Sequence, residues 1–232
     1  MRKAEDRFAR IWAAEKIKWE DGDVAAAMMS GGATVPVDFC LSTIARLNEQ
    51  KDCPIDRVVE TMKHLGKVAG QQFFYPRESL HVSLLGCTQR VGDRHSFEND
   101  QVDRINGAIA AILTGRPPVK IALRGLNVAG SQVFVQCFPF NDDWAQLRCD
   151  IEKALLLLGE KPIAYEDKSP IHLNIMRVTD ADKERLSRTL HCIERLRDED
   201  FGVVELSCIE FLMTDFVVSP ANIKVFKRYH LG

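Results

Sequence analysis

The segment SLHVSLL, residues 79–85, carries the pattern from which the fold can be worked out. Its aliphatic residues predict a continuous β-strand, in which polar side chains occupy alternate positions. Residues two apart in a strand share a face, so His81 and Ser83 point the same way while Val82 and Leu84 face the opposite side. One face of this strand therefore carries an imidazole and a hydroxyl, and the other face is apolar.

A second segment, PIHLNIM at residues 170–176, repeats the pattern 91 residues further on (172 − 81 = 91). By the same rule it places His172 and Asn174 on one face of a strand. A single histidine in a strand most often packs there and bonds to a neighbouring backbone group. Two such strands at equivalent places in a repeated unit favour a functional role for both histidines.

Around these segments strands and helices alternate, and their order recurs in the second half of the chain. The predicted helices are 4–19, 54–65, 97–113, a helix capped by Asn141, and 180–197. The predicted strands are 35–44, 73–75, 80–86, 119–128, 132–138, 171–178, 203–212, and a closing hairpin of 216–218 and 223–226. The recurrence predicts an α+β fold with pseudo-twofold duplicated antiparallel sheets, outer helices and a central cleft between the two histidine strands.

The predicted domain organisation has two parts. Residues 1–34 form an N-terminal helical extension that ends in the flexible link at 30–32, and residues 35–232 form a single bilobal domain. Its lobes are approximately 35–116 and 117–232, and they are free to exchange strands. Packing of the extension on the main body is the favoured interpretation; a lid that brings Trp12 or Trp19 to a site is the alternative.

Composition excludes several classes of protein. The formal net charge is −2, with no long basic run, which does not suit a protein that grips duplex DNA through its phosphates. The seven cysteines are scattered without a CxxC pair, which indicates reduced thiols, a cytoplasmic location and no zinc site. No apolar run is long enough to span a membrane. The segment Asp180–Asp182 is typical of a helix N-terminus rather than of a metal site.

The paired histidines suit phosphoryl chemistry. Imidazole titrates near neutrality, so two histidines can hold opposite protonation states and act as general base and general acid. The Ser83 hydroxyl and the Asn174 amide can donate hydrogen bonds to the non-bridging oxygens of a phosphate. Such a mechanism requires no metal and no cofactor.

Four further residues precede the two segments and are candidates for substrate binding. Tyr75 and Arg77 come before the first, and Tyr165 and Lys168 come before the second. An aromatic ring can stack on a base and a cation can meet a phosphate, although the favoured interpretation is that these are ordinary loop residues.

The two histidine segments resemble the paired H-x-[ST] motifs of the two-histidine (2H) phosphoesterase superfamily, which includes 2′-5′ RNA ligase-like proteins and cyclic phosphodiesterases. His81 and Ser83 match the motif fully; His172 matches, and Asn174 departs from the expected Ser or Thr. The resemblance implies a metal-independent phosphoesterase that hydrolyses a 2′,3′-cyclic phosphate or a related phosphodiester on a nucleotide or RNA end, with reversal giving ligation.

Two alternatives stay open at this point. Asn174 favours a non-catalytic module of the same fold that binds RNA or a nucleotide. A structural protein, in which the two histidines only pack, would hold its imidazoles far apart or away from any cleft.

Overall fold

The computed structural model describes residues 2–163 and 170–232. The helices of the described chain are α1 (Arg2–Asp21), α2 (Ile55–Ala69), α3 (Asn99–Leu113), α4 (Asp143–Leu157) and α5 (Lys183–Arg195). The strands are β1 (Met29–Ser30), β2 (Ala33–Thr34), β3 (Phe39–Arg46), β4 (Phe73–Phe74), β5 (His81–Gly86), β6 (Val119–Ala129), β7 (Gln132–Pro139), β8 (His172–Arg177), β9 (Asp200–Leu206), β10 (Cys208–Asp215) and β11 (Lys224–His230).

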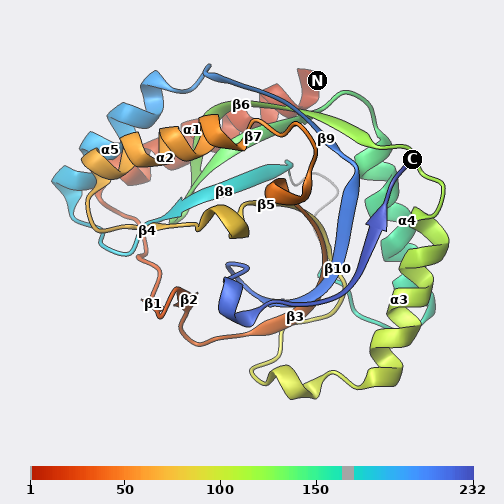
Figure 1. The fold of residues 1–232 in the computed structure, drawn as a ribbon. Coiled ribbons are helices and arrows are strands. Elements are labelled where there is room, and N and C mark those ends of the chain that lie inside the picture. Colours follow the sequence, from red (N-terminus) through yellow and green to blue (C-terminus); the bar gives the residue numbers. More distant parts are fainter. Residues whose placement is uncertain (1, 164–169) are drawn as a thin grey trace.

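The strands form two main antiparallel sheets with helices on their outer faces. One sheet has the order β11-β10-β3-β5, the other has the order β4-β8-β7-β6-β9, and β1 and β2 pair separately. α3 and α4 lie against the first sheet, and α2 and α5 lie against the second (Figure 1). This is the predicted α+β class.

Each sheet takes strands from both halves of the sequence. β10 and β11, from the C-terminal end, complete the sheet of β3 and β5, while β4 pairs with β8 in the other sheet. The helices cross over in the same way, because α2 packs against α5 and α3 packs against α4. Each sheet therefore contains strands from both sides of the predicted lobe boundary between 116 and 117, so the two sheets exchange strands.

The strand predicted over 203–212 is wrong, because it is two strands in different sheets. β9 ends at Leu206, β10 begins at Cys208, and Ser207 alone lies between them. The side chain of Gln50 fixes this crossing: its amide oxygen accepts from the backbone N–H groups of Ser207 (2.8 Å) and Cys208 (3.0 Å). Its amide nitrogen donates to the carbonyl oxygens of Cys208 (2.9 Å) and Arg46 (2.8 Å).

The closing hairpin also differs from the prediction. Residues 216–218 form a turn, in which Val218 has a φ of 54°. The carboxylate of Asp215 holds the turn by accepting hydrogen bonds from the backbone N–H groups of Val217 (3.1 Å) and Ser219 (2.9 Å). The last strand, β11, runs to His230, beyond the predicted end at 226.

The N-terminal helix is packed firmly on the five-stranded sheet. Trp19 is fully buried, and its indole N–H donates to the Gly130 carbonyl (3.0 Å). Phe8 packs edge-on against Phe138, with ring centroids 5.2 Å apart. Within the described ranges, no helix has the length and apolar character needed to cross a bilayer.

Candidate functional site

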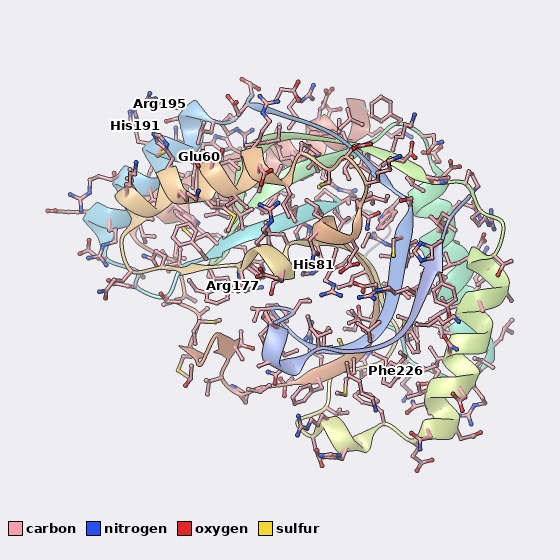
Figure 2. The ribbon with its side chains drawn as sticks, in the orientation of Figure 1. Glu60, His81, Arg177, His191, Arg195 and Phe226 are labelled. Atoms are coloured by element: carbon pink, nitrogen blue, oxygen red, sulfur yellow. The ribbon has the colours of Figure 1, made fainter. Side chains whose placement is uncertain are left out.

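His81 and His172 come together although they lie in different sheets. Each is the first residue of its strand, β5 or β8, and these two strands are in contact where the sheets meet. When His172 is protonated, its charge lowers the pKa of the His81 imidazole. Figure 2 shows His81 in the middle of the molecule, between the two sheets, with Arg177 beside it.

Each imidazole is held by a hydrogen bond of the same kind, from Nδ1 to the backbone carbonyl two residues earlier. Nδ1 of His81 lies 2.7 Å from the carbonyl oxygen of Ser79, and Nδ1 of His172 lies 3.1 Å from that of Pro170. A carbonyl oxygen only accepts, so Nδ1 carries the proton and donates in each case. In the neutral form of each ring, Nε2 is therefore the basic nitrogen, and it is the atom left for a substrate.

Burial keeps both histidines neutral at pH 7. It lowers the pKa of His81 to about 4, against the hydrogen bond to Ser79, and the nearby charges of His172, Arg46 and Arg177 act in the same direction as burial. Burial likewise lowers the pKa of His172, and the charges of Arg148 and Arg177 add to this effect. A bound phosphate, being an anion, opposes these causes and favours an imidazolium.

The two short polar residues of the motifs lie on the same faces as the histidines. Ser83 and Asn174 are both half-buried. The side-chain oxygen of Asn174 is buried and has no hydrogen-bond partner among the described residues. A buried amide oxygen without a partner is costly, so it marks a place where a bound group or a turn of the amide would complete the bonding.

Arg177 joins the site through a β-bulge, and the two-residue periodicity of the sequence missed it. Register between β8 and β7 pairs Asn174 with Phe134 and Met176 with Val133, so that Ile175 has no partner in β7. The extra residue reverses the alternation, and Arg177 therefore shares the face of His172 and Asn174.

Arg177 is buried at 4% exposure and is held on two sides. Its Nε donates to the hydroxyl of Tyr75 (2.8 Å), and its guanidinium lies over the ring of Phe216, 4.3 Å from the centroid. No carboxylate of the described chain forms an ion pair with it. A buried guanidinium with no carboxylate partner within 2–163 and 170–232, beside two imidazoles, is suited to receive an anion.

Two further arginines border the site and were also missed. Arg46 lies directly opposite His81 on β3, and its charge is neutralised by buried Glu210, which accepts from Arg46 Nη2 (2.7 Å). Arg148 of α4 donates from Nε to the carbonyl of Leu84 (2.8 Å), next to the motif strand. Neither carries a signal in the sequence, because both reach the site only through strand pairing or helix packing.

The four predicted substrate-binding residues fall in different places. Tyr75 is buried and supports Arg177. Arg77 forms an ion pair with Asp56 at the start of α2. Tyr165 and Lys168 lie outside the described residues.

Among residues 2–163 and 170–232, no three His, Cys, Asp or Glu side chains gather in a way that could hold a metal ion. The segment 180–182 begins a helix as predicted: the carboxylate of Asp182 accepts from the backbone N–H of Arg185 (2.9 Å) and caps α5.

Solved structures share this fold, while sequence comparison alone finds no relative. No family model matches the chain, and no curated protein matches it significantly. TT0787 of Thermus thermophilus superposes with a TM-score of 0.60 at 14% identity, covering 83% of this chain and 97% of its own.

A structure described as a phosphoesterase gives a TM-score of 0.56 at 12% identity, and E. coli LigT complexed with ATP gives 0.55 at 11%; each comparison covers 84% of this chain and 98% of the other. LigT has also been solved with NADP+ and with 3′-AMP. At these identities the likeness concerns the arrangement of strands and helices, and it covers most of the chain.

Proposed function

We propose that this chain, which has the fold of E. coli LigT and of a solved phosphoesterase, is itself a metal-independent two-histidine phosphoesterase. Its substrate would be a 2′,3′-cyclic phosphate or a related phosphodiester on a nucleotide or RNA end. The seven free cysteines fit a cytoplasmic enzyme.

The observation that carries the proposal is the matched tautomer of His81 and His172. In both, a carbonyl two residues earlier in the chain accepts a hydrogen bond from Nδ1–H and leaves Nε2 for the reaction. A packing role alone does not account for a buried and a half-buried imidazole, from different sheets, fixed in the same way beside a guanidinium that has no carboxylate partner among the described residues.

The proposed reaction uses the two imidazoles in turn. The neutral histidine takes a proton from water through Nε2, and the water oxygen forms a bond to phosphorus. The bond from phosphorus to the ribose oxygen breaks, and the protonated histidine gives its proton to that oxygen. Arg177, Ser83 and Asn174 supply positive charge and hydrogen-bond donors to the non-bridging oxygens, whose charge increases in the transition state.

Nucleotides are the favoured substrate class because a 2′,3′-cyclic phosphate supplies the ribose oxygen that leaves in this reaction. The LigT structures hold ATP, NADP+ and 3′-AMP, which supports a nucleotide ligand for the same fold here. Within this class, a five-membered cyclic phosphate offers a leaving oxygen that stays attached to the product. The same steps with a strand hydroxyl in place of water as the nucleophile would give ligation.

A turnover screen tests the proposal. The four 2′,3′-cyclic nucleotides and short RNAs ending in a cyclic phosphate are incubated with the protein in EDTA. We expect hydrolysis, with kcat reduced about 10²- to 10⁴-fold in His81→Asn and in His172→Asn. His191→Asn, at an exposed position on α5, is the matched control and should keep full activity. Full turnover in both site variants would remove the mechanism.

The second candidate is a non-catalytic module that binds a nucleotide or RNA, and Asn174 favours it. Its amide replaces the expected hydroxyl, and its oxygen is buried without a partner in the described part of the chain. Saturable binding of a nucleoside monophosphate without turnover of any cyclic phosphate would support this candidate over the enzyme.

A further inference from the structure

Ser79, whose carbonyl accepts from Nδ1 of His81, is itself fixed by hydrogen bonds on every side. The residue is fully buried, and its backbone N–H donates to the carbonyl of Pro76 (2.9 Å). Its hydroxyl donates to the carbonyl of Val218 (2.6 Å). Every polar group of Ser79 is therefore used, and the hydroxyl bond joins the start of the His81 strand to a segment 139 residues away in the sequence.

The segment that accepts this bond is the turn of residues 215–219, which follows β10. Val218 has a φ of 54°, a left-handed conformation that a β-branched residue adopts only when its surroundings impose it. The buried carboxylate of Asp215 imposes it by accepting from the backbone N–H groups of Val217 and Ser219 and from the Ser219 hydroxyl. The direction of the Val218 carbonyl is thus set by the side chain of Asp215.

Two further contacts of this turn lie at the candidate site. The ring of Phe216 lies against the guanidinium of Arg177, with 4.3 Å to the centroid. The buried side chain of Val218 packs with Ile44, and Ile44 pairs with Ser83 of the first histidine motif. One short segment therefore bonds to the residue before β5 and also supports the cation carried by β8.

Pro170 cannot hold His172 in the same way. It stands two residues before His172, as Ser79 does before His81, but proline has neither a hydroxyl nor a backbone N–H to donate. The bond from Nδ1 of His172 to the Pro170 carbonyl is 3.1 Å long, against 2.7 Å at His81. His172 is also half-buried, whereas His81 is buried. The two imidazoles are thus matched in tautomer but not in how firmly the accepting carbonyl is held.

We propose that the turn 215–219 is a positioning element for His81, acting through the hydroxyl of Ser79. By fixing Ser79, the Val218 carbonyl fixes the oxygen that accepts from Nδ1, so that the proton stays on Nδ1 and Nε2 stays directed to the substrate. Asp215 is then a positioning residue that acts on the reaction through this chain of bonds. The inference rests on the proposed function for the use of Nε2 in the reaction.

Three variants and a matched control test the chain of bonds. Ser79→Ala removes the hydroxyl, and Asp215→Asn replaces a carboxylate oxygen by an amide nitrogen, which cannot accept a hydrogen bond. Asp215→Asn/Val218→Gly adds a glycine, which adopts a positive φ without being held there. The control Ser42→Ala makes the same chemical change as Ser79→Ala, because the buried Ser42 hydroxyl also donates to a backbone carbonyl, that of Leu85 (3.0 Å) in β5.

Two kinds of measurement are made on each protein. Long-range proton–nitrogen NMR spectra at pH 7.5 show which nitrogen of each imidazole carries the proton, and His81→Asn and His172→Asn assign the signals. Values of kcat and KM are measured with 2′,3′-cyclic AMP, and urea unfolding checks that each variant is folded under the assay conditions. The NMR measurement needs no turnover, so it tests the positioning of His81 independently of the proposed function.

We expect Nδ1 of both rings to carry the proton in the wild type. In Ser79→Ala and in Asp215→Asn, His81 should show a mixture of the two tautomers, while His172 should stay as in the wild type. In both variants kcat should fall about tenfold with KM changed less than about twofold, because a displaced imidazole affects the reaction more than binding. The added Val218→Gly should raise kcat above that of Asp215→Asn, and the control should resemble the wild type.

Other outcomes would overturn the inference. An unchanged His81 tautomer in both single variants, or an equal change at His81 and His172, would make the turn a part of the general scaffold. A further fall in kcat on adding Val218→Gly would do the same. If Asp215→Asn does not fold, Ser79→Ala and its control decide alone. Absence of turnover by the wild type would defeat the proposed function, and the NMR spectra would still decide whether Ser79 positions His81.

Discussion

Gly86 and Arg177 occupy equivalent positions in the two halves of the site, each five residues after its histidine (86 − 81 = 5; 177 − 172 = 5). Both strands are bulged before this position, because the register skips Leu84 in β5 as it skips Ile175 in β8. A Cβ at Gly86 would meet Ile163 Cδ1 at 2.7 Å, so this side has room for no side chain. Of these two equivalent positions, only the one in β8 carries a cation.

Arg177→Met should lower kcat/KM at least about 100-fold while leaving the free energy of unfolding unchanged or raised. The reason is that a buried cation without a counter-ion costs stability in the free protein and is compensated by a bound anion. Arg177→Lys keeps the charge but loses the planar fork, so it should recover only part of the activity. Turnover of a cyclic nucleotide and urea unfolding are the measurements.

Tyr75→Phe is the control for this interpretation, because it removes only the hydroxyl that accepts from Arg177 Nε. The fall in kcat/KM caused by Tyr75→Phe should be smaller than that caused by Arg177→Met and should appear mainly in kcat. An Arg177→Met protein that is both active and less stable would assign Arg177 to the scaffold instead.

Asn174→Thr should keep or raise the activity. A hydroxyl donates to the same non-bridging oxygen, and the substitution removes the buried amide oxygen that finds no partner among the described residues. The variant is compared with wild type in kcat for the best cyclic substrate, and Asn174→Ala serves as the variant without a donor. Complete loss in the Thr variant would show that the amide has a role of its own.

The pH dependence of kcat/KM should be bell-shaped with its alkaline limb below pH 6.5. This parameter reports the free protein, in which the acid must be protonated, and burial lowers the pKa of both His81 and His172 from 6.5. The two limbs belong to the coupled pair rather than to either residue. The alkaline limb of kcat should lie higher, because bound phosphate favours the imidazolium. A kcat/KM that stays constant up to pH 8 would contradict the buried pair.

The same pKa shifts predict a loss of stability in acid. The pKa of His81 is about 4 in the folded protein against 6.5 as its ordinary value. Between these pH values the unfolded chain binds a proton that the folded chain does not, so the free energy of unfolding falls as the pH drops from 6.5 toward 4. The slope is at most about 1.4 kcal/mol per pH unit for each histidine.

Urea unfolding at pH 7 and pH 4.5 measures this effect. His81→Asn/His172→Asn should lose less stability between the two pH values than the wild type does, by about 2 kcal/mol. The exposed His191→Asn variant controls for the general response of the carboxylates to acid. An equal loss in all three proteins would mean that the site histidines are hydrated.

Alternation of side chains was sufficient to predict the two motif strands, the shared faces of His81 with Ser83 and of His172 with Asn174, and the α+β class. It failed where the backbone departs from regular geometry. The bulge at Ile175 moved Arg177 to the other face, and no local residue pattern announces such a bulge. The break at Ser207 was missed because an apolar run continues on both sides of it.

Arg148 and Arg46 show a different limit of the sequence. Arg148 reaches the site from α4, which packs against β5, and Arg46 reaches it from β3, the strand paired with β5. Only the assembled tertiary structure brings them near the histidines. Phe140 is exposed although Phe138 is buried, because the strand ends one residue before Phe140.

The single-residue crossing at Ser207 limits how the two halves can move. A hinge-like opening about this point would break the three hydrogen bonds that Gln50 makes to Ser207 and Cys208. We therefore expect the spacing of the two imidazoles to stay the same when a ligand binds. For the proposed reaction, we therefore expect substrates to be distinguished by how well the phosphate fits a spacing that is set before binding.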